Sequence, residues 1–205
     1  MAQRREPLEA ATVGLRLHTG WAVAVALAST LRVVDRRRLT LVEETDHDAV
    51  FVYHAAAELS GAAAERLVTK ALGIAQACAV NEMTRLVSDL AASGHFVTAV
   101  GLPRGPQRPL PPFGDILHSH PLIHAAEGEL FRSALLDACS KLGLTVVGVA
   151  SKELLPQAAQ ATGLRPAELK RRIDGLERTL GAPWAKDQKE AALASLVAAG
   201  ATSTR

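Results

Sequence analysis

The chain of 205 residues is poor in aromatic side chains, which make up 3% of it, and it contains only two cysteines. So few aromatic rings leave little surface on which nucleobases could stack. Cys78 and Cys139 lie far apart, each inside a helical pattern. This spacing is unlike the disulfide framework of a small secreted protein, and it favours free, buried thiols in a reducing compartment.

Long apolar runs and excess charge are missing as well. No stretch approaches about 18 consecutive apolar residues without a charge, so no membrane span is expected. The polar N-terminus lacks the apolar segment of a signal peptide, and the predicted location is the cytoplasm. A formal net charge of +2 is too small to favour nucleic acid as a partner. The basic runs at 36–38 and 170–172 are typical of a solvated turn or helix face, so nucleic acid stays a weakly supported partner.

The hydrophobic pattern predicts an α/β fold. An apolar fraction of 48% suits one soluble domain with a sizeable core. Alternation predicts strands and helical spacing predicts helices in this order: strands at 13–17, 21–27 and 39–42 with a polar turn at 35–38, a helix at 62–92, a strand at 96–100, a proline-rich loop at 103–114, a helix at 121–142, a strand at 144–149, and two or three helices over 152–199. Residues 45–54 fit a strand or a helix. We expect a mixed five-stranded sheet, a three-strand antiparallel meander plus crossover strands, flanked by helices and followed by a C-terminal helical extension.

Two segments carry a family resemblance. Residues 14–20, Gly-Leu-Arg-Leu-His-Thr-Gly, precede an apolar strand and resemble the first hairpin of Holliday-junction resolvases, which belong to the ribonuclease H-like superfamily. Residues 184–194, from Trp184 to Ala194, resemble the C-terminal helix that carries the last catalytic aspartate of that family. The resemblance implies a ribonuclease H-like core at 11–150, with C-terminal helices at 151–199 packing on it. Disordered tails are expected at 1–10 and 200–205.

The chain departs from the family at the catalytic acids. The family places an acid at the end of the first strand, where this chain has Arg16, and another near the end of the fourth, where residues 100–103 offer none. Only Asp187 matches. Two-metal phosphodiester cleavage needs several carboxylates, and a guanidinium repels Mg²⁺. The resemblance therefore implies a protein that is degenerate at the nuclease site. No cofactor is expected.

Three of the seven histidines fall within seven residues, at 118, 120 and 124, where a helix is predicted to begin. His120, His124 and Glu127 are spaced i, i+4 and i+7, and so share one helical face. That face continues into apolar residues, so it is expected to point inward. If the resemblance holds, Arg16, His18, His118, His120 and Asp187 approach one cleft, with the proline-rich loop as its roof.

Several chemistries fit these residues. Arg16, protonated histidines and helix N-terminal amides suit an anion such as phosphate or carboxylate. His120, His124 and Glu127, with or without His118, resemble a zinc ligand set, and a His–Glu pair also suits general base catalysis. A buried structural pair explains the same residues without any ligand.

Three functions follow, and whether the protein is an enzyme stays open. The first is an anion-binding ribonuclease H-like protein without metal at its candidate site, which comprises Arg16, His18, His118, His120, His124, Glu127 and Asp187. The second is a metal-dependent hydrolase that uses His120, His124 and Glu127. The third is a non-catalytic assembly or regulatory module in which the alanine-rich C-terminal helices form a homodimer.

Overall fold

A five-stranded mixed sheet forms the centre of the computed structural model, which describes residues 7–29, 31–43, 45–105 and 108–203. The strand order is β3-β2-β1-β4-β5. Antiparallel pairs join β1 to β2 and β2 to β3, whereas β4 and β5 continue in parallel from β1. The strands are β1 (Glu9–His18), β2 (Trp21–Ala28), β3 (Arg32–Thr40), β4 (His95–Pro103) and β5 (Val146–Val149). The sheet predicted from the hydrophobic pattern is confirmed.

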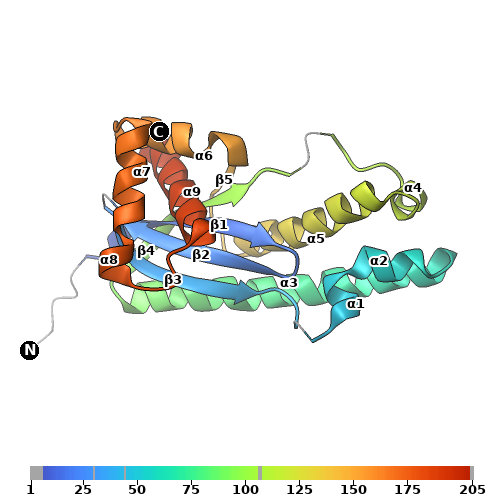
Figure 1. Cartoon of the computed structure of the whole chain (residues 1–205). Coiled ribbons are helices and arrows are strands. Elements are labelled where there is room, and N and C mark those ends of the chain that lie inside the picture. The colour runs from blue at the N-terminus through green and yellow to red at the C-terminus, as the bar shows by residue number, and fades with distance from the viewer. Residues whose placement is uncertain (1–6, 30, 44, 106–107, 204–205) are drawn as a thin grey trace, which may run out of the picture.

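Two long helices, α3 (Gly61–Ala92) and α5 (His120–Lys141), cover one face of the sheet (Figure 1). Their buried side chains recur every three or four residues, as the sequence predicts for both helices. Between them and the sheet lies the larger apolar core, which includes Val13, Leu15, Met83, Leu86, Leu90, Phe131 and Leu135. Cys139 is fully buried in this core, and burial raises the pKa of its thiol to about 11. Cys78 is partly buried, and both cysteines are free.

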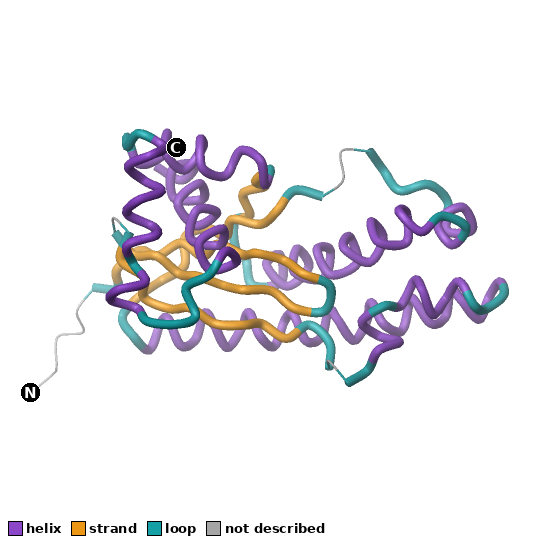
Figure 2. Tube along the Cα trace, viewed as in Figure 1, coloured by secondary structure: helices purple, strands orange, loops and turns teal. Residues whose placement is uncertain are grey.

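The C-terminal helices cover the opposite face of the sheet (Figure 2). They comprise η1 (Ser151–Glu153), α6 (Leu154–Thr162), α7 (Pro166–Gly175), α8 (Glu177–Leu180) and α9 (Lys186–Ser203). Alanines of α9, among them Ala191 and Ala198, are fully buried in this layer of the same chain. The alanine-rich face of α9 is therefore covered within the chain itself. The expected homodimer stays a prediction.

Three short helices lie beyond one end of the sheet (Figure 1): α1 (His47–Val50), α2 (Val52–Ala57) and α4 (Phe113–Leu117). Segment 45–54, which the sequence left open, is thus largely helical. A small apolar cluster of Ile116, Ile123 and Ala126, with Tyr53 packed against it, joins α2, α4 and α5. The proline-rich loop leads from β4 to α4, and its residues 106–107 lie outside the described part of the chain.

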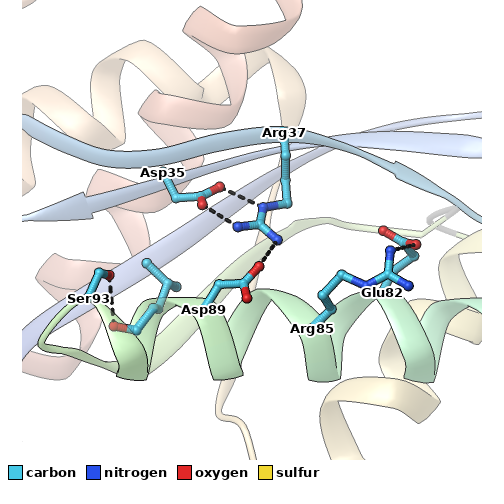
Figure 3. Close-up of polar contacts among 7 residues, drawn as sticks. Asp35, Arg37, Glu82, Arg85, Asp89 and Ser93 are labelled. Carbon is cyan, nitrogen blue, oxygen red and sulfur yellow. Dashed lines mark hydrogen bonds and ion pairs between the residues drawn. The ribbon is translucent and has the colours of Figure 1, made fainter.

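The predicted polar turn at 35–38 is wrong, because these residues lie inside β3. An edge strand tolerates charge when its side chains find partners on both faces. On the α3 side, Arg37 pairs with Asp35 and bonds Asp89 of α3 at 2.7 Å (Figure 3). These carboxylates raise the pKa of Arg37 above its ordinary value, although partial burial opposes the shift. Arg36 and Arg38 alternate onto the other face, so the basic run is divided between both sides of the sheet.

The expected tails and the second basic run can also be compared with the structure. β1 begins at Glu9 and α9 continues to Ser203, so both elements extend into the expected tails. The second basic run lies on α7, where Lys170 and Arg172 form ion pairs with acids four residues away, as a solvated helix face predicts. Within the described residues, no helix is both long and apolar enough to cross a bilayer.

Candidate functional site

The close approach of α9 to the sheet sets the geometry of the first candidate site. Gly14 of β1 faces α9, and a Cβ placed there would lie 1.8 Å from the Ala191 carbonyl oxygen. At Gly101 of β4 the corresponding distance to the Ala194 oxygen is 2.1 Å. Glycine therefore allows helix and strand backbones to touch. Gly101 lies in the segment where the family is expected to carry its second acid, and no side chain fits there.

Arg16 and His18 lie farther along the same face of β1, because side chains alternate along a strand. The Arg16 Nε is 2.6 Å from Glu190 Oε2 and 3.8 Å from Asp187 Oδ1. His18 Nε2 is 3.1 Å from Asp187 Oδ2. All four side chains are about one quarter to one third exposed. The first two turns of α9 thus present two acids to the arginine. One of them, Glu190, was not singled out by the sequence analysis.

The ring of His18 stacks on Trp21 of β2, with centroids 4.1 Å apart and planes within 8°. The Arg38 guanidinium lies 3.8 Å from the centroid of the same indole. Positive charge above an indole face is favourable, and the contact is stronger where water is excluded. Three segments that the sequence separates, the β1–β2 turn, β3 and α9, therefore meet around one aromatic ring.

A pocket of about 270 Å³ opens beside this ring. We call it the Arg36 pocket. The residues that line it are Trp21, Val23, Arg36, Arg37, Arg38, Pro183, Asp187 and Gln188. Arg36 donates hydrogen bonds to four backbone carbonyls of residues 180–183, at distances from 2.6 to 3.3 Å. Carbonyl oxygens hold a guanidinium in place without cancelling its charge. The pocket is small, since drug-sized sites usually reach 300 Å³ or more.

This donor set does not fit a pair of Mg²⁺ ions. Hard divalent cations require oxygen ligands with net negative charge. Asp187 and Glu190 supply two carboxylates, but the Arg16 guanidinium lies within ion-pair distance of both. A cation that is already part of the protein thus lies between the two carboxylates of α9.

The histidine-rich segment forms a second, separate group. His120 and His124 occupy the first turns of α5, and Glu127 is 1% exposed. His54 of α2 completes the group, because its Nδ1 lies 2.9 Å from Glu127 Oε1. Burial and the nearby Glu127 carboxylate raise the pKa of Tyr53. The inward orientation of Glu127 agrees with the spacing argument, whereas both histidines are exposed.

Two expected members of the site do not join this group. The His118 ring bonds the Gly114 carbonyl through Nδ1 at 2.7 Å, at the junction of α4 and α5. The described part of the proline-rich loop follows α5: a Cβ at Gly105 would touch the Arg132 guanidinium, and Leu110 packs on the cluster of Ile116, Ile123 and Ala126. The loop therefore lies on the α5 side rather than above Arg16.

The expectation of one shared cleft is corrected accordingly. Arg16 and His18 contact Asp187 of α9, whereas His120, His124 and Glu127 belong to α5, which packs on the opposite face of the sheet. The physical reason is the alternation of β1: Leu15 enters the core beneath α3 and α5, so Arg16 must point the other way. His54 was missed because nothing in the sequence links residues 54 and 127.

Comparison with known proteins identifies the architecture. No family model matches the chain, and neither does any curated protein. Among solved structures the chain is similar to RuvC of Thermus thermophilus, a Holliday-junction resolvase, with a TM-score of 0.52 and 12% sequence identity. The alignment covers 95% of this chain and 96% of that chain. The fold expected from residues 14–20 and 184–194 is therefore confirmed as ribonuclease H-like.

Proposed function

With the ribonuclease H-like fold as premise, we propose that this protein binds a phosphate- or carboxylate-bearing anion in the Arg36 pocket and does not cleave nucleic acid by two-metal chemistry. The observation that carries the proposal is the Arg16 ion pair with Glu190 and Asp187. A fixed guanidinium neutralises these acids and repels divalent cations. It does not repel an anionic ligand, so the loss of one activity is compatible with binding at the same face.

The pocket chemistry supports the choice of an anion. The partners of the Arg36 guanidinium are carbonyl oxygens, which carry no formal charge to neutralise it. The acidic residue of the lining, Asp187, is instead shared with Arg16 and His18. The indole of Trp21 forms part of the wall. Within a pocket, an interaction between charges is stronger than on an open surface. A small anion thus fits both the volume and the charge.

Replacing Arg16 with aspartate is expected to create a divalent-cation site. Three carboxylates would then face one another, and their mutual repulsion is relieved when Mg²⁺ or Mn²⁺ binds through oxygen. We expect Arg16→Asp to bind one Mn²⁺ with a Kd on the order of 0.1–1 mM, as in weak carboxylate sites. Titration followed by electron paramagnetic resonance measures the ion that is left free.

The matched control is Arg16→Gln, which removes the guanidinium without adding a carboxylate. It should bind far less Mn²⁺ than Arg16→Asp does. The unmodified protein, which keeps the guanidinium, should bind no Mn²⁺ at this face. Magnesium-dependent cleavage of a four-way DNA junction by the unmodified protein, abolished in Asp187→Asn, is the result that overturns the proposal.

Anion binding is tested with pyrophosphate and citrate in isothermal titration calorimetry at low ionic strength. Arg36→Gln keeps amide donors for the carbonyls of residues 180–183 but lacks the charge, so we expect its Kd to rise about tenfold or more, equivalent to about 1.4 kcal/mol. Arg178→Gln, an exposed arginine of α8, is the control and should leave the Kd unchanged. Equal affinities in these two variants, or no binding at millimolar concentrations, would exclude the pocket.

A further inference from the structure

Three imidazoles converge at the end of the molecule beyond the sheet. His54 comes from α2, and His120 and His124 come from the first turns of α5. The ring centroids lie 4.4 to 5.3 Å apart, and one ring nitrogen of each residue lies within 4.8 Å of the other two. A tetrahedral ion with Zn–N bonds of 2.0–2.1 Å requires nitrogens about 3.4 Å apart, so each ring has to move inward by about 1 Å or less. His120 and His124 are exposed and free to rotate that far.

Beneath the rings lies the Glu127 carboxylate, which is 1% exposed. Its Oε1 bonds the Nδ1 of His54 at 2.9 Å, and its Oε2 is 3.7 Å from the Nδ1 of His124 without a hydrogen-bond partner. A buried carboxylate is costly unless positive charge compensates it. In the described part of the chain, its recorded ion-pair partners are these two histidines. Their Nδ1 atoms face the acid, which leaves the Nε2 atoms outside this contact.

We propose that His54, His120 and His124 bind a divalent transition ion of the zinc class, with Glu127 as a positioning residue behind them. Imidazole nitrogens select Zn²⁺, Co²⁺, Ni²⁺ or Cu²⁺ over Mg²⁺ and Ca²⁺, which prefer oxygen. A carboxylate that accepts a hydrogen bond from a ligating histidine fixes its tautomer and orientation, and this arrangement recurs in zinc sites. Three protein ligands leave a coordination position open to solvent, as in catalytic rather than structural zinc centres.

The surrounding structure supports the ligand geometry. The cluster of Ile116, Ile123 and Ala126 holds α2, α4 and α5 together, so the two elements that supply ligands are fixed relative to each other. One effect opposes the site, since the N-terminus of α5 carries a partial positive charge worth about 0.3–1 kcal/mol against a cation. The full negative charge of Glu127 lies closer to the imidazoles and outweighs it. The predicted ligand set is thereby revised: Glu127 moves behind the ligands, and His54 takes its place.

The experiment uses the full chain without a histidine tag, stripped with a chelator, reloaded with Zn²⁺ and desalted. We expect about one equivalent of zinc by inductively coupled plasma mass spectrometry. After substitution with cobalt, we expect a visible spectrum typical of four-coordinate Co²⁺. His124→Ala should lower zinc affinity at least tenfold, and because this side chain is 55% exposed, its removal leaves the apolar core intact. Glu127→Gln should weaken binding about 10–100-fold while it leaves the three imidazoles in place.

The matched control is His118→Ala, because His118 lies beside the same helix but bonds the Gly114 carbonyl. It should bind zinc as the unmodified protein does. Less than a tenth of an equivalent in the unmodified protein, or equal zinc loss in His118→Ala and His124→Ala, overturns the site. The outcome is independent of anion binding in the Arg36 pocket, which lies on the opposite face of the sheet.

Discussion

Replacing Gly14 with valine is expected to lower the free energy of unfolding by at least about 3 kcal/mol, the upper range for overpacked cores. The first added carbon would lie 1.8 Å from the Ala191 oxygen and 2.3 Å from the Ser195 nitrogen, both of which are backbone atoms. Backbone cannot rotate away as a side chain does, so α9 has to leave the sheet. Urea unfolding followed by circular dichroism measures the loss.

Gly73→Ala is the control for this prediction. Gly73 is an exposed residue of α3, and a Cβ there meets nothing within 4 Å. Alanine restricts the unfolded chain more than glycine does, so this variant should gain about 0.5–1 kcal/mol. If Gly14→Val instead unfolds at the same urea concentration as the unmodified protein, α9 does not lie on β1 as described.

A second large effect is expected where Thr12 meets Ser195. The Thr12 and Ser195 hydroxyl oxygens lie 2.8 Å apart, and each also lies within hydrogen-bond distance of the other residue's carbonyl oxygen, at 3.0 and 2.8 Å, so their two protons are shared among three contacts. Both residues are buried. Thr12→Val or Ser195→Ala leaves a buried polar group without its partner, which costs about 1–3 kcal/mol.

The double variant separates this network from two unrelated losses. Because the hydroxyls act together, we expect Thr12→Val with Ser195→Ala to cost less than the sum of the single variants, by about 1 kcal/mol. Ser133→Ala, which removes only a bond to the Leu130 carbonyl within α5, should cost less than either of them. Strict additivity in urea unfolding would show that the two residues do not act as a unit.

The fold was predictable because its apolar pattern is regular. The apolar spacing from Leu67 to Leu90 predicted α3 to within one residue at its start, and alternation in β1 and β2 predicted the hairpin. The prediction failed at β3, where residues 35–38 are charged and resemble a turn. Their strand conformation depends on partners such as Asp89 and the carbonyls of residues 180–183, which are distant in the sequence.

The candidate sites were predictable only where one element carries the residues. The helical spacing of His124 and Glu127 placed them correctly on one face of α5. The relation of His54 to Glu127 and that of Arg16 to Glu190 arise from contacts between elements, and neither leaves a signal in a single sequence. The assumption that all charged residues share one cleft ignored the sheet between them, although the alternation of Leu15 and Arg16 already contained that information.

The contact of Thr12 with Ser195 joins residues that are 183 positions apart. At a synthesis rate of about 5–20 residues per second, β1 leaves the ribosome on the order of 10–40 s before the segment that covers it. During this time Val23, Val25 and Leu27 of β2 have no covering helix, because the residues that bury them belong to the last third of the chain. Completion of the second layer is thus a late event in biogenesis, and a nascent chain stalled before α9 exposes an adhesive apolar surface.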